Sequence, residues 1–406
     1  MPAIQAGVVM RCKFLVPSSK VFSGYVDYID RDEAIRNENT SKYNGFQHYM
    51  GNPEKSTGLF TADLDYVNPE KAEELKKIFD AAQDRGSLMW QIVISFDNRW
   101  LQENGLYDPE TKVLSEPKIR AAAREAMKTL QEKESLQDGV WSASIHFNTD
   151  NIHVHAAMVE PVPSRQIIET GRYKGQYRGK IANKTIAACK SKVVNSLSHL
   201  PEQNLAINSL IRDTLVNGLR SVKMADFTTD PVLMQEFMQL EQDIAKSVPF
   251  LDKRGYSYAS NHMAPFRERL DALSEKFMMT YYPNEYRDCM DLIKKNAEMY
   301  QKSYGLRSEQ TIGREENKRQ DLFKRMGNVL ISEMRMMRMQ RKADGRPDNA
   351  GSVARAPATR SYSNILFRLL ATVSDEKNRL LSQYRNEEEI ARKKAEYERE
   401  QEGLDY

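Results

Sequence analysis

The chain has 406 residues, enough for two or three domains around a large buried core. Its 60 Lys and Arg residues nearly balance 57 Asp and Glu residues, so any nucleic-acid surface must come from local segregation of charge. Three distant cysteines exclude a disulfide framework and a cysteine zinc site, and no apolar run suits a membrane span or a signal peptide, so we expect a soluble, cytoplasmic protein without membrane insertion.

The chain is expected to begin with a strand and a helix that carries tyrosines. Apolar residues within 5–16 predict a strand, which Pro17 ends. Ser18 and Ser19 can cap a following helix, because apolar side chains then recur at steps of three and four residues, namely at Phe22, Tyr25, Tyr28 and Ile29. Tyrosines one turn apart usually pack in a core, so this pattern alone predicts no chemistry.

The next segments alternate between helices and a strand. Residues 37–69 are polar, with scattered Gly and Pro, and predict a long loop or lid. Helical periodicity covers 71–82, a dense apolar run at 87–96 predicts a central strand, and Ser115 opens a helix that continues to Leu130. This order predicts an α/β (α+β) fold with a largely antiparallel central sheet flanked by helices.

Three of the six histidines lie within ten residues, and this stretch predicts a hairpin. Residues 141–146 alternate between apolar and polar side chains, as in a strand that ends at His146. His153 and His155 are two apart, so on a strand they share one face. The residues between tolerate a tight turn: Asn148, Asp150 and Asn151. Antiparallel pairing would bring His146 beside the other two histidines.

The histidine hairpin predicts a metal centre. Neutral imidazoles are common metal ligands, and three of them leave positions for substrate and water. A second interpretation uses Glu160, which completes an H-x-H-x4-E pattern similar to the metal motif of cupin barrels. Phe147 stands where that motif has a glycine, and His146 would be left without a role. We therefore favour the three histidines over the cupin pattern.

Cations and tyrosines alternate directly after the hairpin. Lysine and arginine bind phosphates, and tyrosine rings stack on unpaired bases, so this composition favours single-stranded nucleic acid. On its own the segment would more often be a solvated loop and helix face, but its position next to a metal centre favours a substrate groove. The residues concerned are Arg172, Tyr173, Lys174, Tyr177, Arg178, Lys180, Lys184, Lys190 and Lys192.

Helical periodicity dominates the rest of the chain. We expect a first domain over 1–200, a helical domain over 201–310, and a charged helical tail over 311–406. Gly and Pro residues within about 343–362 predict a flexible linker in that tail.

The histidine spacing resembles that of a known enzyme family. His146-x6-His153-x-His155 with Asp150-Asn151 between is similar to the HUH metal motif of conjugative relaxases of the MobP type, closest to the MobL branch. The order of further features agrees: Phe22-x5-Tyr28-Ile29 in the first helix, Val93-Ile94-Ser95-Phe96 in a strand, and Glu160-Pro161 with Ser164-Arg165 after the hairpin. The resemblance covers the first 200 residues well and the helical region more loosely.

This resemblance implies a relaxase that nicks one DNA strand at a plasmid transfer origin and later rejoins it. A tyrosine attacks the scissile phosphate and forms a 5′-phosphotyrosyl link, with a divalent ion, Mg²⁺ or Mn²⁺, on the three histidines. Tyr28 matches the family's nucleophile, and Tyr25 is the second choice. Single-stranded origin DNA is the implied partner, and accessory or coupling proteins of the relaxosome could bind the C-terminal helices.

One departure from the family's pattern concerns the base that accepts the tyrosine proton. Where many MobP relaxases have an Asp two residues after the first histidine, this chain has Asn148, which cannot act as a carboxylate base. The possible substitutes are Asp150, Asp97 and Asp27. The expected contacts to DNA phosphates come from Arg165, Arg172, Lys174, Arg178 and Lys180.

Two other functions fit the sequence. HUH proteins also include rolling-circle replication initiators and transposases, which would nick a different DNA site. Outside the enzymes, the chain could be a DNA-binding accessory protein whose histidines are structural.

Overall fold

The computed structural model describes residues 6–17, 58–147, 151–171, 174–221, 230–249 and 252–343. The predicted tyrosine helix, the predicted linker and the predicted last helix lie outside these residues. The chain divides into two compact units, Met1–Asp348 and Asn349–Tyr406. All described residues belong to the first unit.

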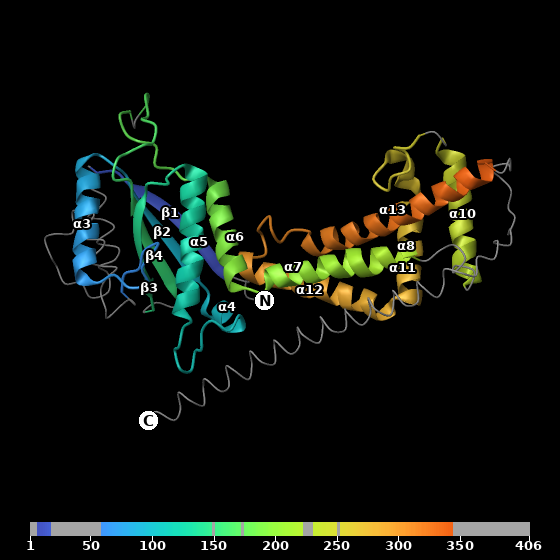
Figure 1. The fold of residues 1–406 in the computed structure, drawn as a ribbon, viewed down its shortest axis with the longest axis horizontal. Coiled ribbons are helices and arrows are strands. Elements are labelled where there is room, and N and C mark those ends of the chain that lie inside the picture. The colour runs from blue at the N-terminus through green and yellow to red at the C-terminus, as the bar shows by residue number, and fades with distance from the viewer. Residues whose placement is uncertain are drawn as a thin grey trace. The chain divides into compact units, whose positions relative to one another are not determined.

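A four-stranded antiparallel sheet forms the N-terminal part of this unit (Figure 1). Its strands are β1 (Val8–Leu15), β2 (Met89–Phe96), β3 (Val140–His146) and β4 (His153–Val159). They lie in the order β1-β2-β4-β3, so that β2 and β4 are central and β1 and β3 form the edges. The predicted α/β fold with an antiparallel sheet is therefore confirmed.

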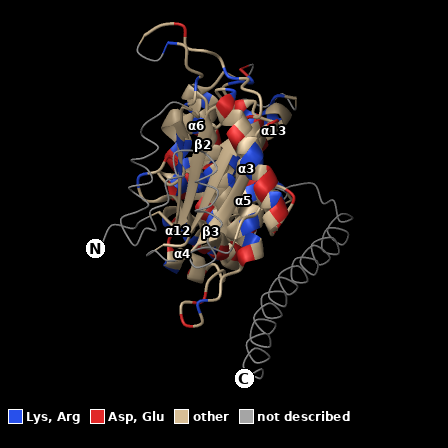
Figure 2. Cartoon of the chain, turned by 90° about the vertical axis from the view of Figure 1, so that its left-hand side faces the viewer, with Lys and Arg blue, Asp and Glu red and all other residues tan. Residues whose placement is uncertain are grey.

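Helices cover both faces of the sheet. On one face, α5 (Glu116–Glu134) and α6 (Asn183–Leu197) pack against a core that contains Trp90, Ile92 and Val154. On the other face, α3 (Pro69–Asp84) covers one end of the sheet through its buried apolar residues. The exposed side of α3 carries charges of both signs (Figure 2). The three histidines lie on this same face, near the start of β4.

The predicted helices of this part are found within a few residues of their expected bounds, and two further helices were missed. A short helix, α4 (Asn98–Glu103), begins where the Asp97 carboxylate accepts a hydrogen bond from the amide of Trp100. Its six residues are too few to show a period. The other, α6, lies within the basic segment, where its lysines masked the buried stripe of Cys189, Val193 and Leu197.

The C-terminal part of the unit is helical, as expected. Its members are α7 (Leu200–Ser209), a π-helical segment η1 (Leu210–Val216), α8 (Asn217–Ser221), α10 (Pro231–Ser247), a 3-10 turn η2 (Asn261–Phe266), α11 (Arg267–Tyr281), α12 (Pro283–Tyr304) and α13 (Arg314–Ala343). Their apolar faces form a second hydrophobic cluster that is separate from the core of the sheet. Among the described residues, none of the helices combines the length and the apolar character that crossing a membrane requires.

One helix, α12, belongs to both hydrophobic clusters. Its first half contributes Tyr286 and Ile293 to the helical cluster, and its last residue, Tyr304, packs in the core of the sheet. Polar contacts support this junction: the Gly7 amide donates to the Lys302 carbonyl at 2.7 Å, and the Trp100 indole donates to the Ser303 hydroxyl at 3.0 Å. The sheet and the helices are thus tied together through the end of α12.

Candidate metal centre

The strand register brings the three histidines to one face of the sheet. His146 on β3 is directly opposite His153 on β4, and Ser144 is opposite His155. Residues opposite each other and residues two apart along a strand point to the same face. The expected hairpin pairing of His146 with the other two histidines is therefore the observed one.

The three imidazole rings form a compact group. Ring centroids are 5.3 Å apart for His146 and His153, 4.8 Å for His146 and His155, and 4.7 Å for His153 and His155. One nitrogen of each ring lies within 4.8 Å of the corresponding nitrogens of the other two. Since a divalent ion takes imidazole nitrogens at about 2.0 to 2.2 Å, small ring rotations suffice to place all three around one ion.

Hydrogen bonds orient two of the rings. The Nδ1 atom of His153 is 2.9 Å from the carbonyl oxygen of Asn151. A carbonyl only accepts, so Nδ1 carries the proton and the lone pair of the neutral ring is on Nε2. The Nε2 atom of His146 is 2.9 Å from the Ser144 hydroxyl, which is fully buried. Such partners fix the ring orientation that a metal ion requires.

Burial favours the neutral form of His153 and His155. It lowers the pKa of His153, although the bond to the Asn151 carbonyl acts in the opposite direction. Burial, with His153 and His146 as neighbours, lowers the pKa of His155 well below its ordinary value of 6.5. A neutral imidazole offers its lone pair without first losing a proton, so the donor set fits a divalent ion.

The side chain of Asn98, at the start of α4, holds the backbone just before His153. The Asn98 side-chain oxygen accepts a hydrogen bond from the Ile152 amide at 2.9 Å, and the Ile152 carbonyl accepts from the Phe96 amide. Ile152 immediately precedes His153, so these bonds fix the backbone from which β4 begins. Residues 98 and 152 are far apart in sequence, and no local pattern could have indicated the pair.

The expected acidic residues lie at different places. Asp97 is close in sequence to Ser95, which pairs with His153, and its carboxylate caps α4. Glu160 lies beyond the opposite end of β4, about 16 Å from His155 along an extended strand, and accepts a hydrogen bond from Ser164. Among described residues, the group that could hold an ion consists of the histidines without Glu160.

Six of the expected site residues lie outside the described part of the chain. These are Tyr25, Tyr28, Asp27, Asn148, Asp150 and Arg172. The structure therefore shows the three candidate metal ligands and not the expected nucleophile or most of the possible bases.

The expected phosphate-binding residues differ in their surroundings. Arg165 donates to Glu134 at 3.0 Å and lies over the Trp90 ring, so its guanidinium is engaged inside the protein. Lys174, Arg178 and Lys180 are exposed. Lys174 and Arg178 lie in a hairpin-like loop, in which the backbone amide of Arg178 donates to the carbonyl of Gln166. Arg172 is outside the described residues.

Two further cations were missed by the sequence analysis. Arg11 and Lys13 on β1 are exposed, and the register places Arg11 in the same cross-strand row as Val93 and His155. They therefore share the face of the histidines, with Arg11 roughly 10 Å from His155, two strand spacings away. The alternation of β1 would have placed both cations on one face, but only the long-range register tells which face.

Comparisons with known proteins agree with the geometry. The family model of MobL relaxases matches residues 5–378, which is nearly the whole chain. Comparison with curated proteins found no match, and comparison with solved structures found none either.

Proposed function

Because this chain belongs to the MobL relaxase family, we propose that it nicks one strand of DNA at a transfer origin by tyrosine transesterification and later rejoins it. The observation that carries this proposal is the convergence of His146, His153 and His155 on one face of the sheet. Single-stranded origin DNA is the proposed partner. The site of action is the cytoplasm, where the C-terminal helices would meet accessory or coupling proteins.

The histidines would hold Mg²⁺ or Mn²⁺. A bound divalent ion supplies Lewis-acid polarisation of the scissile phosphate and offsets the charge that develops on it. The contributions of the chain are the rigid placement of three neutral imidazoles on two paired strands and the orientation of His146 by Ser144 and of His153 by the Asn151 carbonyl.

Tyr28 is the proposed nucleophile. Its hydroxyl oxygen forms a bond to phosphorus, the bond from phosphorus to the 3′ oxygen breaks, and the 3′ oxygen leaves as a hydroxyl after it takes a proton. The tyrosine proton goes to a carboxylate, for which Asp150, Asp97 and Asp27 remain the choices because Asn148 cannot accept it as a base. The covalent link keeps the phosphodiester energy for rejoining.

The DNA strand would pass over the histidine face between exposed cations. Arg11 and Lys13 lie on that face, and Lys174, Arg178 and Lys180 are exposed, so all five are proposed phosphate contacts. Arg165 is the exception among the expected contacts. Since its guanidinium binds Glu134 and covers Trp90, we assign it to anchoring the segment that carries the other cations.

The decisive experiment is to look for a covalent adduct between the protein and a labelled single-stranded origin oligonucleotide. With Mn²⁺, we expect an adduct on a denaturing gel, and chelation should abolish it. Tyr28→Phe should remove the adduct and leave DNA binding intact, because the ring stays and only the attacking oxygen is lost. Tyr25→Phe is the matched control and should retain the adduct.

Each alternative has its own result. An adduct that persists in Tyr28→Phe and disappears in Tyr25→Phe would reassign the nucleophile. DNA binding without any adduct would favour the accessory protein, and nicking at a replication origin instead of a transfer origin would favour an initiator.

A further inference from the structure

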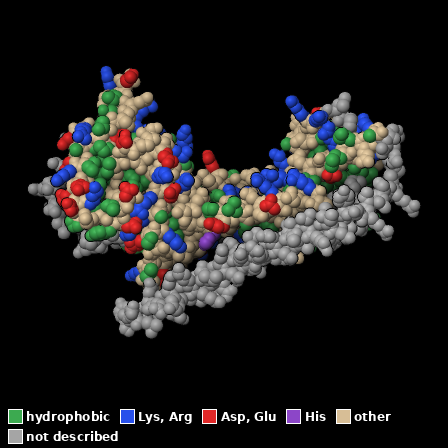
Figure 3. Space-filling view, viewed as in Figure 1, with side chains coloured by type: hydrophobic (Ala, Val, Ile, Leu, Met, Phe, Trp, Pro, Cys, Tyr) green, Lys and Arg blue, Asp and Glu red, His purple; other side chains and the backbone are tan. Residues whose placement is uncertain are grey.

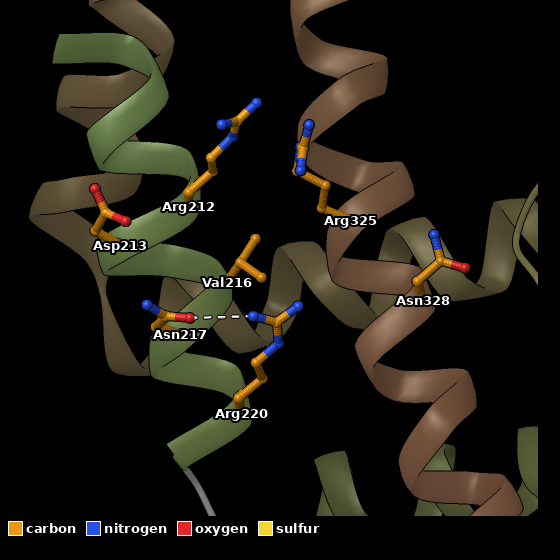
Figure 4. Close-up of a pocket in the computed structure, with 7 residues that line it drawn as sticks. All are labelled: Arg212, Asp213, Val216, Asn217, Arg220, Arg325 and Asn328. Carbon is orange, nitrogen blue, oxygen red and sulfur yellow. Dashed lines mark hydrogen bonds between the residues drawn. The ribbon is translucent and has the colours of Figure 1, made fainter. Parts of the chain in front are cut away.

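A polar cavity of about 400 Å³ lies in the helical part of the unit, between η1 with α8 on one side and α13 on the other (Figure 4). We call it the arginine groove. Three arginines line it, and Figure 4 shows Arg212 and Arg325 on opposite sides and Arg220 below them. The other lining residues include Val216, which Figure 4 shows between the two sides, Asn217 on the side of α8 and Asn328 on α13. Asp213 points to the side of η1 that faces away from α13.

The groove is strongly cationic. Arg212 and Arg220 are exposed, and Arg220 donates to a neutral amide, that of Asn217, at 3.3 Å. Arg325 forms an ion pair with Asp321 at 2.9 Å, but that pair is partly exposed. Burial lowers the pKa of the adjacent Lys318, as do nearby arginines that include Arg212 and Arg325. On the face shown in Figure 3, Lys and Arg side chains gather over α13.

Helices carry these arginines: Arg212 lies in η1, Arg220 in α8 and Arg325 in α13. In η1 and α8 the apolar residues Ile211 and Leu215 are buried in the second hydrophobic cluster, which leaves Arg212 on the opposite, exposed side. A side chain at Gly218 would lie 2.5 Å from the ring of Tyr282, so only glycine lets α8 pack so closely there. π-Helical turns such as η1 are rare and often mark functional sites.

We propose that the arginine groove binds the phosphodiester backbone of DNA at a second contact site, separate from the histidine centre. Guanidinium groups bind phosphate oxygens in pairs, and the side-chain NH2 of Asn217, whose oxygen accepts from Arg220, can donate to the same oxygens. No aromatic side chain of the described residues lines the groove, so it offers no platform for stacking bases. The contact therefore reads no sequence and adds affinity for DNA that flanks the cut. This inference rests on the proposed action on DNA.

The test is the salt dependence of DNA binding by the full chain. Each phosphate contact contributes about 0.7 to 0.9 to the slope of log Kd against log salt concentration. We expect the double variant Arg212→Gln/Arg325→Gln to lower this slope by roughly 1.4 to 1.8, measured by fluorescence anisotropy with a non-origin oligonucleotide. Arg212→Lys/Arg325→Lys should keep the slope, because the charges remain.

Arg287→Gln is the matched control, since Arg287 is an exposed arginine of α12 that does not line the groove, and its slope should equal that of the wild type. Circular dichroism checks that each variant is folded. An unchanged slope in the folded double Gln variant would overturn the proposal. So would calorimetric binding of inorganic phosphate that this variant loses while its DNA slope is unchanged, because the groove would then be a small-anion site. Binding is measured without nicking, so loss of the nicking activity would not affect this result.

Discussion

The hydroxyl of Ser144 orients one of the three histidines. It is fully buried, it lies 2.9 Å from Nε2 of His146, and its residue is directly opposite His155. Partners of this kind set the orientation and the tautomer of a metal-binding ring. We therefore expect Ser144 to contribute to the affinity for the proposed metal ion without contacting it.

Ser144→Ala should lower the affinity for Mn²⁺ about 10- to 100-fold, because the His146 ring loses the partner that orients it. Isothermal titration calorimetry measures the change. Ser142→Ala is the matched control, since Ser142 is equally buried on the same face of β3 but is opposite Ala157 and no histidine. Equal losses in the two variants would show that the effect comes from packing and not from orientation.

Among single residues, the sequence predicted those positions that follow from spacing along one strand or one hairpin. The two-residue period of a strand puts His153 and His155 on one face, and antiparallel pairing in a hairpin brings His146 beside them, so the grouping of the three histidines could be predicted without knowledge of the sheet. The positions of Arg11 and Asn98 depend on pairing between segments that are distant in sequence. No local pattern carries that information.

The C-terminal end of α5 anchors the segment that follows the hairpin. The Glu134 carboxylate is nearly buried and accepts hydrogen bonds from Thr185 at 2.6 Å, from the Ala182 amide at 3.1 Å and from Arg165 at 3.0 Å. Burial raises the pKa of Glu134, but the bonds from Thr185, Ala182 and Arg165 together hold it below its ordinary value of 4.5. The ionised form is thus the one that the fold stabilises.

In Glu134→Gln, the free energy of unfolding should therefore depend less on pH in the acid range than it does in the wild type. Because the folded pKa is lower than the unfolded one, the carboxylate stabilises the fold above about pH 4.5, and this contribution disappears as the pH falls through the folded pKa. The variant should lose about 1.5 to 3 kcal/mol at pH 7 and progressively less at lower pH. Urea unfolding at several pH values measures both quantities. A constant difference from the wild type at all pH values would contradict this role.

The predictability of elements followed their length and their regularity. Amphipathic helices such as α3 and α5 repeat apolar residues over several turns and were predicted within a few residues. The π-helical turn of η1 was not predicted, because Leu210, Ile211 and Leu215 also fit an ordinary α-helical stripe. In the structure η1 packs against other helices, which include α12 and α13, and these contacts leave no trace in the local sequence pattern.

Across the whole described unit, α12 couples the sheet to the helices. All three tryptophans, Trp90, Trp100 and Trp141, belong to the core of the sheet, whereas most of the helical residues after 200 belong to the second cluster. Because α12 packs in both, we expect tryptophan fluorescence and far-ultraviolet circular dichroism to report one coincident urea transition for residues 6–343.

In Glu298→Pro, the urea transition reported by tryptophan fluorescence should no longer coincide with the one reported by far-ultraviolet circular dichroism. Glu298 is an exposed residue of α12, and proline there removes a backbone hydrogen bond and costs the helix about 3 kcal/mol. Glu298→Ala is the control, since it removes the same carboxylate and keeps the helix. Coincident transitions in the proline variant would mean that the coupling does not run through α12.

Because Tyr304 packs in the core of the sheet, the helical region cannot be replaced without a change in that core. A chimera that kept residues 1–200 but took its helices from another source would lack the ring that fills the core of the sheet, the Ser303 hydroxyl for Trp100 and the Lys302 carbonyl for Gly7. Such a chimera should therefore be less stable than the parent chain, unless the donor brings an equivalent end of α12.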